Sequence, residues 1–505
     1  MKLRDKRPQL IKMPKFYITS TLPYTNSSPH IGFALEIIQT DVIARYHKLL
    51  GEEVFFNTGT DEHGLKIYRA ALDAGLSPQR YVDKISEKFR QLNELLNIKH
   101  SYFTRTTDPN HVKAAQEMWR RCRTTGDIYK KHYEVKYCVG CELEKMASEL
   151  VDGCCAIHPN LKIEDIEEEN YFFRFSKYQK PLLKYYKENP DFVLPHFRFN
   201  EIKRFVEDGL QDFSISRLKL KMPWGVPVPD DDEHSMFVWF DALVSYISAL
   251  GWPDEVEKFN SFWPGIQTAG KDNLRQQSAI WQAMLMSAGL PNSKQILIHG
   301  FVTIDGQKMS KSLGNIVDPF KVVAKYGTDV VRYFLLREIS STEDGDFSYK
   351  KLEERYNGDL ANGLGNLIQR VAALIESNMN SELIYNKANS KGLIANGGDY
   401  EKAISEFRLH DALGEIWKRI ADANKYIDDR KPWVEVEESP ERFMETMTTL
   451  VDAIHHIAWL LQPFLPETSD KIFNIFGAPH SRTIPDGHHF IIKKSKPLFP
   501  RLTNS

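Results

Sequence analysis

Two spacings of apolar side chains alternate along the first part of the chain. Residues 15–20, KFYITS, alternate apolar and polar positions as a short strand does. Residues 30–51 then predict a helix that ends at a glycine, with apolar side chains at helical spacing: Ala34, Ile37, Ile38, Val42 and Leu49. Residues 53–64, EVFFNTGTDEHG, predict a strand that runs into a polar loop, and helical patterns fill most of 64–126. This alternation predicts a parallel α/β sheet.

The pattern is interrupted between about residues 127 and 233. This stretch holds most of the cysteines, the acidic run KIEDIEEEN and the segment KMPWGVPVPDDDE, and we interpret it as an insertion. Buried strands resume in SMFVWFDALVSYISALG and KQILIHGFVTIDG, so we expect residues far along the chain to complete the sheet. From about 350 to 475 the spacing is almost wholly helical, which predicts a separate helical domain.

Composition and charge narrow the class of protein. The chain has 505 residues with a net charge of −2, so an acidic partner such as nucleic acid would have to bind a local patch. The most apolar stretches, MFVWFDALVSYISAL and DAIHHIAWLLQPFL, are interrupted by polar residues and are too short to span a bilayer. The basic start lacks the apolar core of a secretory signal. We therefore expect a cytoplasmic protein that makes no membrane contact.

Four of the five cysteines lie within residues 138–155. Cys138 and Cys141 form a C-x-x-C pair, and Cys155 with His158 forms C-x-x-H, which together offer three thiolates and an imidazole to a tetrahedral zinc ion. Cys154 is left over, because adjacent residues rarely both point at one ion. The alternative is a reduced C-x-x-C pair with an unrelated histidine nearby.

The joint between the first strand and the first helix, PYTNSSPHIGFALE, is a candidate phosphate site. A helix start presents unpaired N–H groups to an anion, and His30 can donate a further hydrogen bond. Gly32 allows a ribose or base to approach the backbone closely. On its own, however, the joint is more typical of an ordinary capped helix with a surface histidine.

A second candidate is the loop DGQKMSKSLGN, residues 305–315. Lys308 and Lys311 lie three residues apart with Ser310 between them, and such lysines can neutralise a transferred or departing phosphate. Any two lysines can also form a solvated basic loop, but the whole string KMSKS between glycines is much rarer by chance.

In these two motifs the chain resembles the class I aminoacyl-tRNA synthetases, and within them the methionyl-tRNA synthetase family. The resemblance rests on PHIGF and KMSKSLGN together with TLPY, TGTDEHG, the cysteine cluster, FVWFDALVSY, GKD, NGLGNLIQR and DRKPW. It extends from residue 21 to residue 433.

The resemblance implies a Rossmann-like parallel-sheet catalytic domain that is split by a zinc-knuckle insertion and followed by an all-α anticodon-binding bundle. Along the chain it implies the first half of the catalytic domain over 1–126, a connective insertion with the knuckle over 127–233, and the second half over 234–304. The KMSKS loop and stem-contact region would then occupy 305–358, and the helical anticodon-binding domain 359–505.

The resemblance also assigns residues to ligands. His30, Gly32, Gly270, Asp272, Lys308, Ser310 and Lys311 would bind ATP, with His30, Lys308 and Lys311 acting in catalysis. The methionine site would be formed by Leu22, Tyr24, Asp61, Trp239, Ala242, Leu243, Tyr246 and Gln277, in which Asp61 binds the ammonium. The anticodon would be read by Asn366, Arg370 and Trp433. Two positions depart from the family pattern, since Phe33 and Gln277 stand where histidines are usual.

The implied activity is that of a methionine–tRNA ligase, which activates L-methionine with ATP and transfers it to the 3′ end of tRNA(Met), the initiator tRNA included. Zinc would be structural, and Mg²⁺ would accompany ATP. No editing or dimerising domain is apparent, so we expect a monomer. The alternative, motivated by Phe33, Gln277 and the neighbouring Asn273 and Gln276, is a catalytically impaired paralogue that acts as a tRNA-binding protein.

Overall fold

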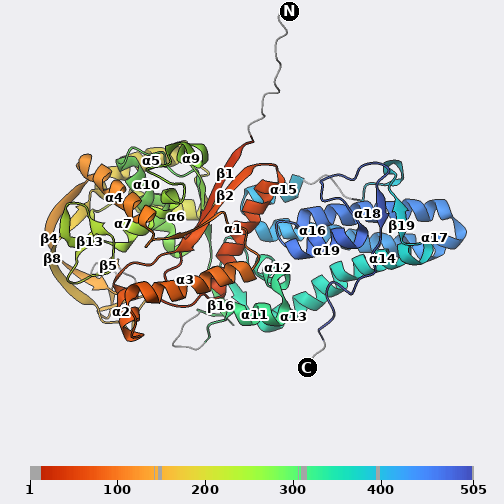
Figure 1. The fold of residues 1–505 in the computed structure, drawn as a ribbon, viewed down its shortest axis with the longest axis horizontal. Coiled ribbons are helices and arrows are strands. Elements are labelled where there is room, and N and C mark those ends of the chain that lie inside the picture. Colours follow the sequence, from red (N-terminus) through yellow and green to blue (C-terminus); the bar gives the residue numbers. More distant parts are fainter. Residues whose placement is uncertain are drawn as a thin grey trace, which may run out of the picture.

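The computed structural model describes residues 13–140, 143–145, 150–304, 306–308, 315–393 and 398–502. Its long axis runs from the insertion to the tip of the helical domain: Figure 1 shows β4 and β8 at one end, α17 at the other, and β1, β2 and α1 between them. In the part of the chain described, no helix combines the length and the apolarity needed to cross a bilayer.

A six-stranded sheet forms the centre of the α/β part of the chain, in the order β3-β2-β1-β14-β15-β9. All its neighbouring strands pair in parallel. The strands are β1 (Lys15–Ser20), β2 (Glu53–Thr60), β3 (Tyr102–Arg105), β9 (Val193–Leu194), β14 (Ile266–Gly270) and β15 (Gln295–His299). β1 and β2 from the first half of the chain thus lie beside β14 and β15, as the resumption of apolar strands predicts.

Two hydrophobic cores cover the two faces of this sheet, and β1 explains the alternation in KFYITS. Phe16 and Ile18 lie in one core, and Tyr17 lies in the other. The first core contains α1 (Ile31–Leu49), α3 (Pro78–Leu95) and α12 (Thr328–Glu338) and is continuous with the helical domain. The second contains α4 (Pro109–Thr124) and α10 (Trp281–Ser287). The sheet is therefore buried on both sides, as parallel sheets are.

The insertion has a sheet of its own, with strand order β10-β8-β4-β5. Its long hairpin pairs β4 (Ile128–Cys138) with β8 (Glu164–Phe173), and β5 (Leu143–Lys145) and β10 (Phe213–Ser214) flank them. A small hairpin of β6 (Leu150–Val151) and β7 (Cys154–Cys155) lies in the connection between β5 and β8. One piece of the stretch interpreted as an insertion, β9, pairs with β15 in the central sheet.

The helical domain packs α14 (Asn366–Asn378), α16 (Leu409–Arg430), α18 (Pro440–Leu461) and α19 (Pro466–Phe476), with the short α17 (Pro432–Glu438) at its far end. In α16 the side chains of Leu413, Ile416, Ile420 and Ile427 are fully or almost fully buried, which is the spacing of one helix face.

Arg332 in α12 joins this domain to the α/β part of the chain. It is fully buried, lies 2.8 Å from Asp41 of α1 and donates hydrogen bonds to the carbonyls of Pro463 and Phe464.

Candidate active site

The start of α1 is organised by His30. This residue caps the helix in an extended conformation, and its Nδ1 accepts a hydrogen bond from the N–H of Gly32 at 3.1 Å. In the neutral ring the proton is therefore on Nε2, where it can serve an anion at the helix start. The sequence predicted a capped helix or a phosphate site here, and the same histidine is suited to both.

The segment that follows the KMSKS string returns to this helix start. The N–H of Ile31 donates to the carbonyl of Val317 at 3.2 Å. The backbone of Lys308 pairs with Thr303 in the hairpin of β16 (Val302–Ile304) and β17 (Gln307–Lys308). The helix start thus lies beside Val317, almost three hundred residues later in the chain. Ser310, Lys311 and the side chain of Lys308 lie outside the described residues.

Phe33, which stands where a second histidine is usual, belongs to the core. Its side chain is buried, and its ring meets Phe89 of α3 edge-on at 5.0 Å. The phenyl ring therefore packs α1 onto α3, and the helix start with His30 does not depend on its chemistry.

The GKD segment lies at the end of β14. A Cβ on Gly270 would come within 2.7 Å of the Asp272 carboxylate, so a larger residue would displace this side chain, and it would be in ordinary contact with the His299 ring at 3.7 Å. Lys271 turns away and pairs with Asp344 at 2.6 Å. The end of the strand thus offers a carboxylate beside a bare backbone, a place where a sugar can approach.

Sequence reasoning missed Glu36 and His299, which form a buried pair beside this strand end. Nε2 of His299 lies 2.9 Å from Oε2 of Glu36, and Oε1 of Glu36 accepts the N–H of Thr21 at 2.8 Å. Burial alone would lower the pKa of His299, but the Glu36 carboxylate outweighs it and raises that pKa. A charged residue on the buried face of the first helix was the signal that could have revealed the pair.

The expected methionine residues come from four separate segments of the chain. Tyr24 pairs with Asp61 across two chain segments, with hydrogen bonds from the N–H of Thr25 to the Asp61 carbonyl and from the Asp61 N–H to Pro23, both at 3.0 Å. Tyr24 and Trp239 also share a small apolar cluster with Tyr137 and Phe237. The buried Nε1–H of Trp239 has no hydrogen-bond partner among the described residues.

The remaining members of this set line the same region from α7 (Val238–Ala242) onwards. Ala242, Leu243 and Tyr246 are buried, while Leu22 is half-buried just after β1. Burial raises the pKa of the Tyr246 hydroxyl, and the negative charges of Glu36 and Asp61 raise it further. Tyr246 therefore stays neutral and lies within the electrostatic reach of Asp61.

Gln277, the other departure, completes a buried chain of polar groups. It lies in the π-helical turn η4 (Gln276–Ile280), and its amide donates to the Tyr246 hydroxyl. Its carbonyl oxygen accepts from Gln267 at 2.9 Å, and Gln267 in turn accepts from Ser293 at 2.5 Å. The glutamine therefore supplies a polar partner to Tyr246 at the position where a histidine is usual.

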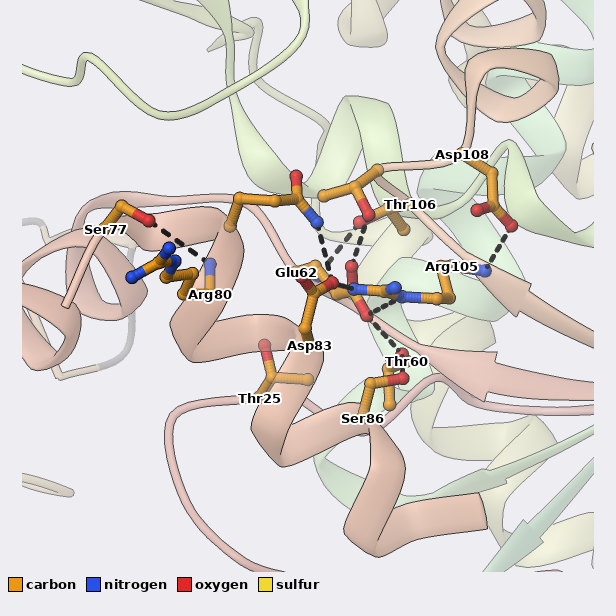
Figure 2. A network of polar contacts seen from close by, with 12 residues as sticks. Thr25, Thr60, Glu62, Ser77, Arg80, Asp83, Ser86, Arg105, Thr106 and Asp108 are labelled. Carbon is orange, nitrogen blue, oxygen red and sulfur yellow. Dashed lines mark hydrogen bonds and ion pairs between the residues drawn. The ribbon is translucent and has the colours of Figure 1, made fainter.

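The loop after β2 is braced by ionic contacts of Glu62, which is fully buried. Arg105 binds Glu62 at 2.7 Å and Asp83 of α3 at 2.6 Å (Figure 2). The N–H of Glu62 donates to Thr106 at 2.9 Å. These contacts hold the backbone immediately after Asp61 in place.

Cys138, Cys155 and His158 form a group whose ligand atoms all lie within 4.8 Å of one another. Cys138 Sγ and His158 Nδ1 are 3.8 Å apart. A tetrahedral zinc ion with Zn–S of about 2.3 Å and Zn–N of about 2.05 Å requires S···N separations of about 3.6 Å, so the donor set fits zinc. Cys141, the expected fourth ligand, lies outside the described residues. Cys154 is half-buried and is not part of the group.

The expected anticodon residues lie toward the far end of the helical domain. Asn366 is exposed on α14, and Arg370, one turn further, pairs with Asp428 of α16 at 2.7 Å. Trp433 at the start of α17 is 49% exposed, which is unusual for tryptophan and leaves an aromatic face available for a base.

Comparison with known proteins gives the following similarities. The family model described as tRNA synthetases class I (M) matches residues 16–164 and 144–372, and the model described as anticodon-binding domain of tRNA ligase matches 398–499. The methionine–tRNA ligase of Thermotoga maritima is 45% identical over 91% of this chain and 75% of its own length. That of Rhizobium meliloti is 39% identical over 99% of both chains. Mycobacterium tuberculosis methionyl-tRNA synthetase, solved in complex with methionyl-adenylate, superposes with a TM-score of 0.91 at 38% identity, covering 97% of this chain and all of that one.

Proposed function

The chain belongs to the methionyl-tRNA synthetase family of class I aminoacyl-tRNA synthetases, and from that premise we propose the reaction and the roles of its residues. The carboxylate of L-methionine attacks the α-phosphorus of ATP, and the bond to the β-phosphate oxygen breaks. Pyrophosphate leaves with the electron pair, and methionyl-adenylate remains. A hydroxyl of the terminal ribose of tRNA(Met) then attacks the acyl carbon, and AMP departs. The activity is that of a methionine–tRNA ligase.

In the first step the protein has little covalent work to do, and positioning with charge stabilisation supplies the rate. The start of α1, with His30 and Gly32, holds the phosphates. Gly270 and Asp272 receive the ribose. Lys308, Ser310 and Lys311 cover the departing pyrophosphate, and Mg²⁺ accompanies ATP. The observation that carries this assignment is the hydrogen bond from Ile31 to Val317, because it joins the helix start to the segment that follows the two lysines.

The amino acid occupies the site between Asp61 and the aromatic residues. Asp61 receives the ammonium, and Leu22, Tyr24, Trp239, Ala242, Leu243, Tyr246 and Gln277 surround the side chain. A thioether is polarizable and gains from contact with aromatic edges, which suits the pair Tyr24 and Trp239.

Cys138, Cys141, Cys155 and His158 would hold a zinc ion, whose role would be structural. These ligands come from the end of β4 and from the small hairpin and its surroundings, so a bound ion would link the two. The substrate contacts named above come from other residues, so no step of the reaction passes through the metal.

The helical domain recognises the tRNA. Asn366 and Arg370 hydrogen-bond unstacked anticodon bases, and Trp433 stacks on one of them. The tRNAs bound are those for methionine, including the initiator. We expect the protein to act as a monomer in the cytoplasm.

Pyrophosphate exchange with ATP and each of the twenty amino acids tests this proposal. Methionine alone should support exchange, and Lys311→Ala should lower its rate by on the order of 100-fold, as expected for the loss of about 3 kcal/mol of charge stabilisation. Lys321→Ala, on the exposed face of α11 (Pro319–Tyr326), is the matched control and should leave the rate unchanged. Exchange within a few-fold of normal in Lys311→Ala contradicts the assigned role. Absence of exchange with every amino acid favours the tRNA-binding paralogue.

A further inference from the structure

Three consecutive residues leave β2 and are fixed in different ways. Asp61 is tied through its backbone to Pro23 and Thr25. Glu62 is clamped by Arg105 at 2.7 Å. His63 turns to the opposite side and lies 2.6 Å, Nδ1 to Oδ2, from the carboxylate of Asp241. The backbone of the residue assigned to the substrate ammonium is therefore held directly, and the two residues that follow it are held by separate ionic contacts.

The contact of His63 with Asp241 continues as a chain of buried polar groups. The other oxygen of Asp241 lies 2.7 Å from Nε2 of His111 in α4, and Nδ1 of His111 lies 3.0 Å from Oγ of Ser248 in α8 (Ser245–Ser248). His63, Asp241 and His111 are 6%, 0% and 1% exposed, respectively. This series of hydrogen-bonded residues thus joins the loop after β2 to three helices and is buried along its length.

Asp241 carries a full negative charge in this setting. Burial opposes ionisation, but the two imidazoles outweigh it and lower the pKa of Asp241 to about 2. A carboxylate can only accept, so His63 donates from Nδ1 and His111 from Nε2. Both ring orientations are thereby set by one carboxylate.

The position of Asp241 connects this series of hydrogen-bonded residues to the proposed methionine site. It lies in the one-and-a-half turns of α7 that also carry Trp239 and Ala242, two residues assigned to the methionine side chain. His63 lies two residues after Asp61. The contact between His63 and Asp241 therefore sets the spacing between the group that binds the ammonium and the wall that binds the thioether.

We propose that the chain His63–Asp241–His111 is a positioning device that holds Asp61 at a fixed distance from the α7 wall, so that ammonium and side chain are bound at the same time. The three residues act through Asp61 and touch no substrate atom. This inference rests on the proposed function, in which Asp61 binds the ammonium.

Two inhibitors of pyrophosphate exchange separate positioning from general stability. Methioninol keeps the ammonium and lacks the carboxylate, whereas 4-(methylthio)butanoic acid keeps the carboxylate and lacks the ammonium. His63→Leu removes the donor to Asp241, and His63→Asn is its matched control, because the Asn amide nitrogen takes a place close to that of Nδ1. His63→Leu should weaken inhibition by methioninol by about tenfold or more and leave the acid within about twofold, and His63→Asn should restore most of the methioninol affinity.

The remaining outcomes overturn the proposal. If inhibition by both compounds is weakened equally, or if His63→Asn does not restore inhibition by methioninol, the three hydrogen-bonded residues only stabilise the fold. If His63→Leu does not fold, Asp241→Asn, which keeps the shape and removes the charge, must give the same selective loss. Asp61→Asn separates the ammonium-binding role of Asp61 from the positioning role of the three residues. If it leaves inhibition by methioninol unchanged, Asp61 does not bind the ammonium, and the positioning role is wrong as well. If it weakens methioninol while His63→Leu and Asp241→Asn do not, only the positioning role fails.

Discussion

Replacement of Cys155 by serine tests the metal site with a control at the adjacent position. Cys155 is 1% exposed and shares its ligand group with Cys138 and His158, whereas the neighbouring Cys154 faces partly outward. A structural zinc site of four ligands binds with roughly 10–16 kcal/mol. If that free energy is shared among the ligands, loss of one thiolate removes about 3 kcal/mol, or on the order of 100-fold in affinity.

The assay is the zinc content of each purified variant after gel filtration in the presence of a chelator, together with zinc release to a chromogenic dye. The unchanged protein and Cys154→Ser should retain about one zinc ion per chain, and Cys155→Ser should lose most of it. Equal loss in both serine variants would refute the assignment of Cys155, since it would mean that the two adjacent thiols share the ion or that neither binds it.

The same substitution has a consequence at the methionine site, because the two regions are in contact. Lys66 donates to the carbonyl of Gly140 at 3.2 Å and lies 6.0 Å from the ring centre of Tyr24. Tyr137 and Val139, on either side of Cys138, pack in the cluster that contains Tyr24 and Trp239. We therefore expect Cys155→Ser to raise KM for methionine more than KM for ATP. A parallel rise in both would mean that the knuckle only stabilises the insertion.

Three further changes test other contacts. Phe33→His buries an imidazole against Phe89 and should lower the free energy of unfolding by about 1–3 kcal/mol. The rate of pyrophosphate exchange should fall no more than a few-fold. A gain in activity without loss of stability would mean that the side chain at position 33 faces the nucleotide. Gln277→Ala leaves the Tyr246 hydroxyl and the Gln267 amide without their partner and should lower the free energy of unfolding in urea by about 1–3 kcal/mol. Gln277→His should recover part of that loss. Equal stability of the unchanged protein and both variants would contradict the buried hydrogen-bond series. Burial, aided by the charge of Arg419, lowers the pKa of His456 to about 4 from 6.5, so the unfolded chain binds more protons between these values and stability falls as pH drops through that window. His456→Gln should remove about 2 kcal/mol of the loss between pH 7 and pH 5, and an unchanged pH slope in chemical denaturation would contradict the shift.

Local patterns in the sequence predict the elements that depend on local physics. The alternation in KFYITS predicts β1 because its side chains divide between two cores. The spacing of Ala34, Ile37, Ile38 and Val42 predicts α1, but the helix is buried on nearly all sides, so its polar residues Glu36, Gln39 and Asp41 are buried as well. The grouping of Cys138, Cys155 and His158 is also predictable, since thiolates and an imidazole at short spacing are typical of a metal site. By contrast, nothing in the order of residues indicates that Val193 and Leu194 extend the central sheet, because strand order depends on contacts between distant segments.

Phe33 and Gln277 show why a departure from a family pattern cannot be judged from sequence alone. At both positions an expected polar side chain is replaced, but the two replacements have different physical meanings. Phe33 lies in the core between α1 and α3, so the exchange substitutes apolar packing for a polar group and leaves the cap made by His30 intact. Gln277 keeps a polar group in a buried chain that includes Tyr246 and Gln267, so its neighbours still find hydrogen-bond partners. Whether a substitution disables a site depends on whether its neighbours remain satisfied, and those neighbours are known only once the fold has brought them together.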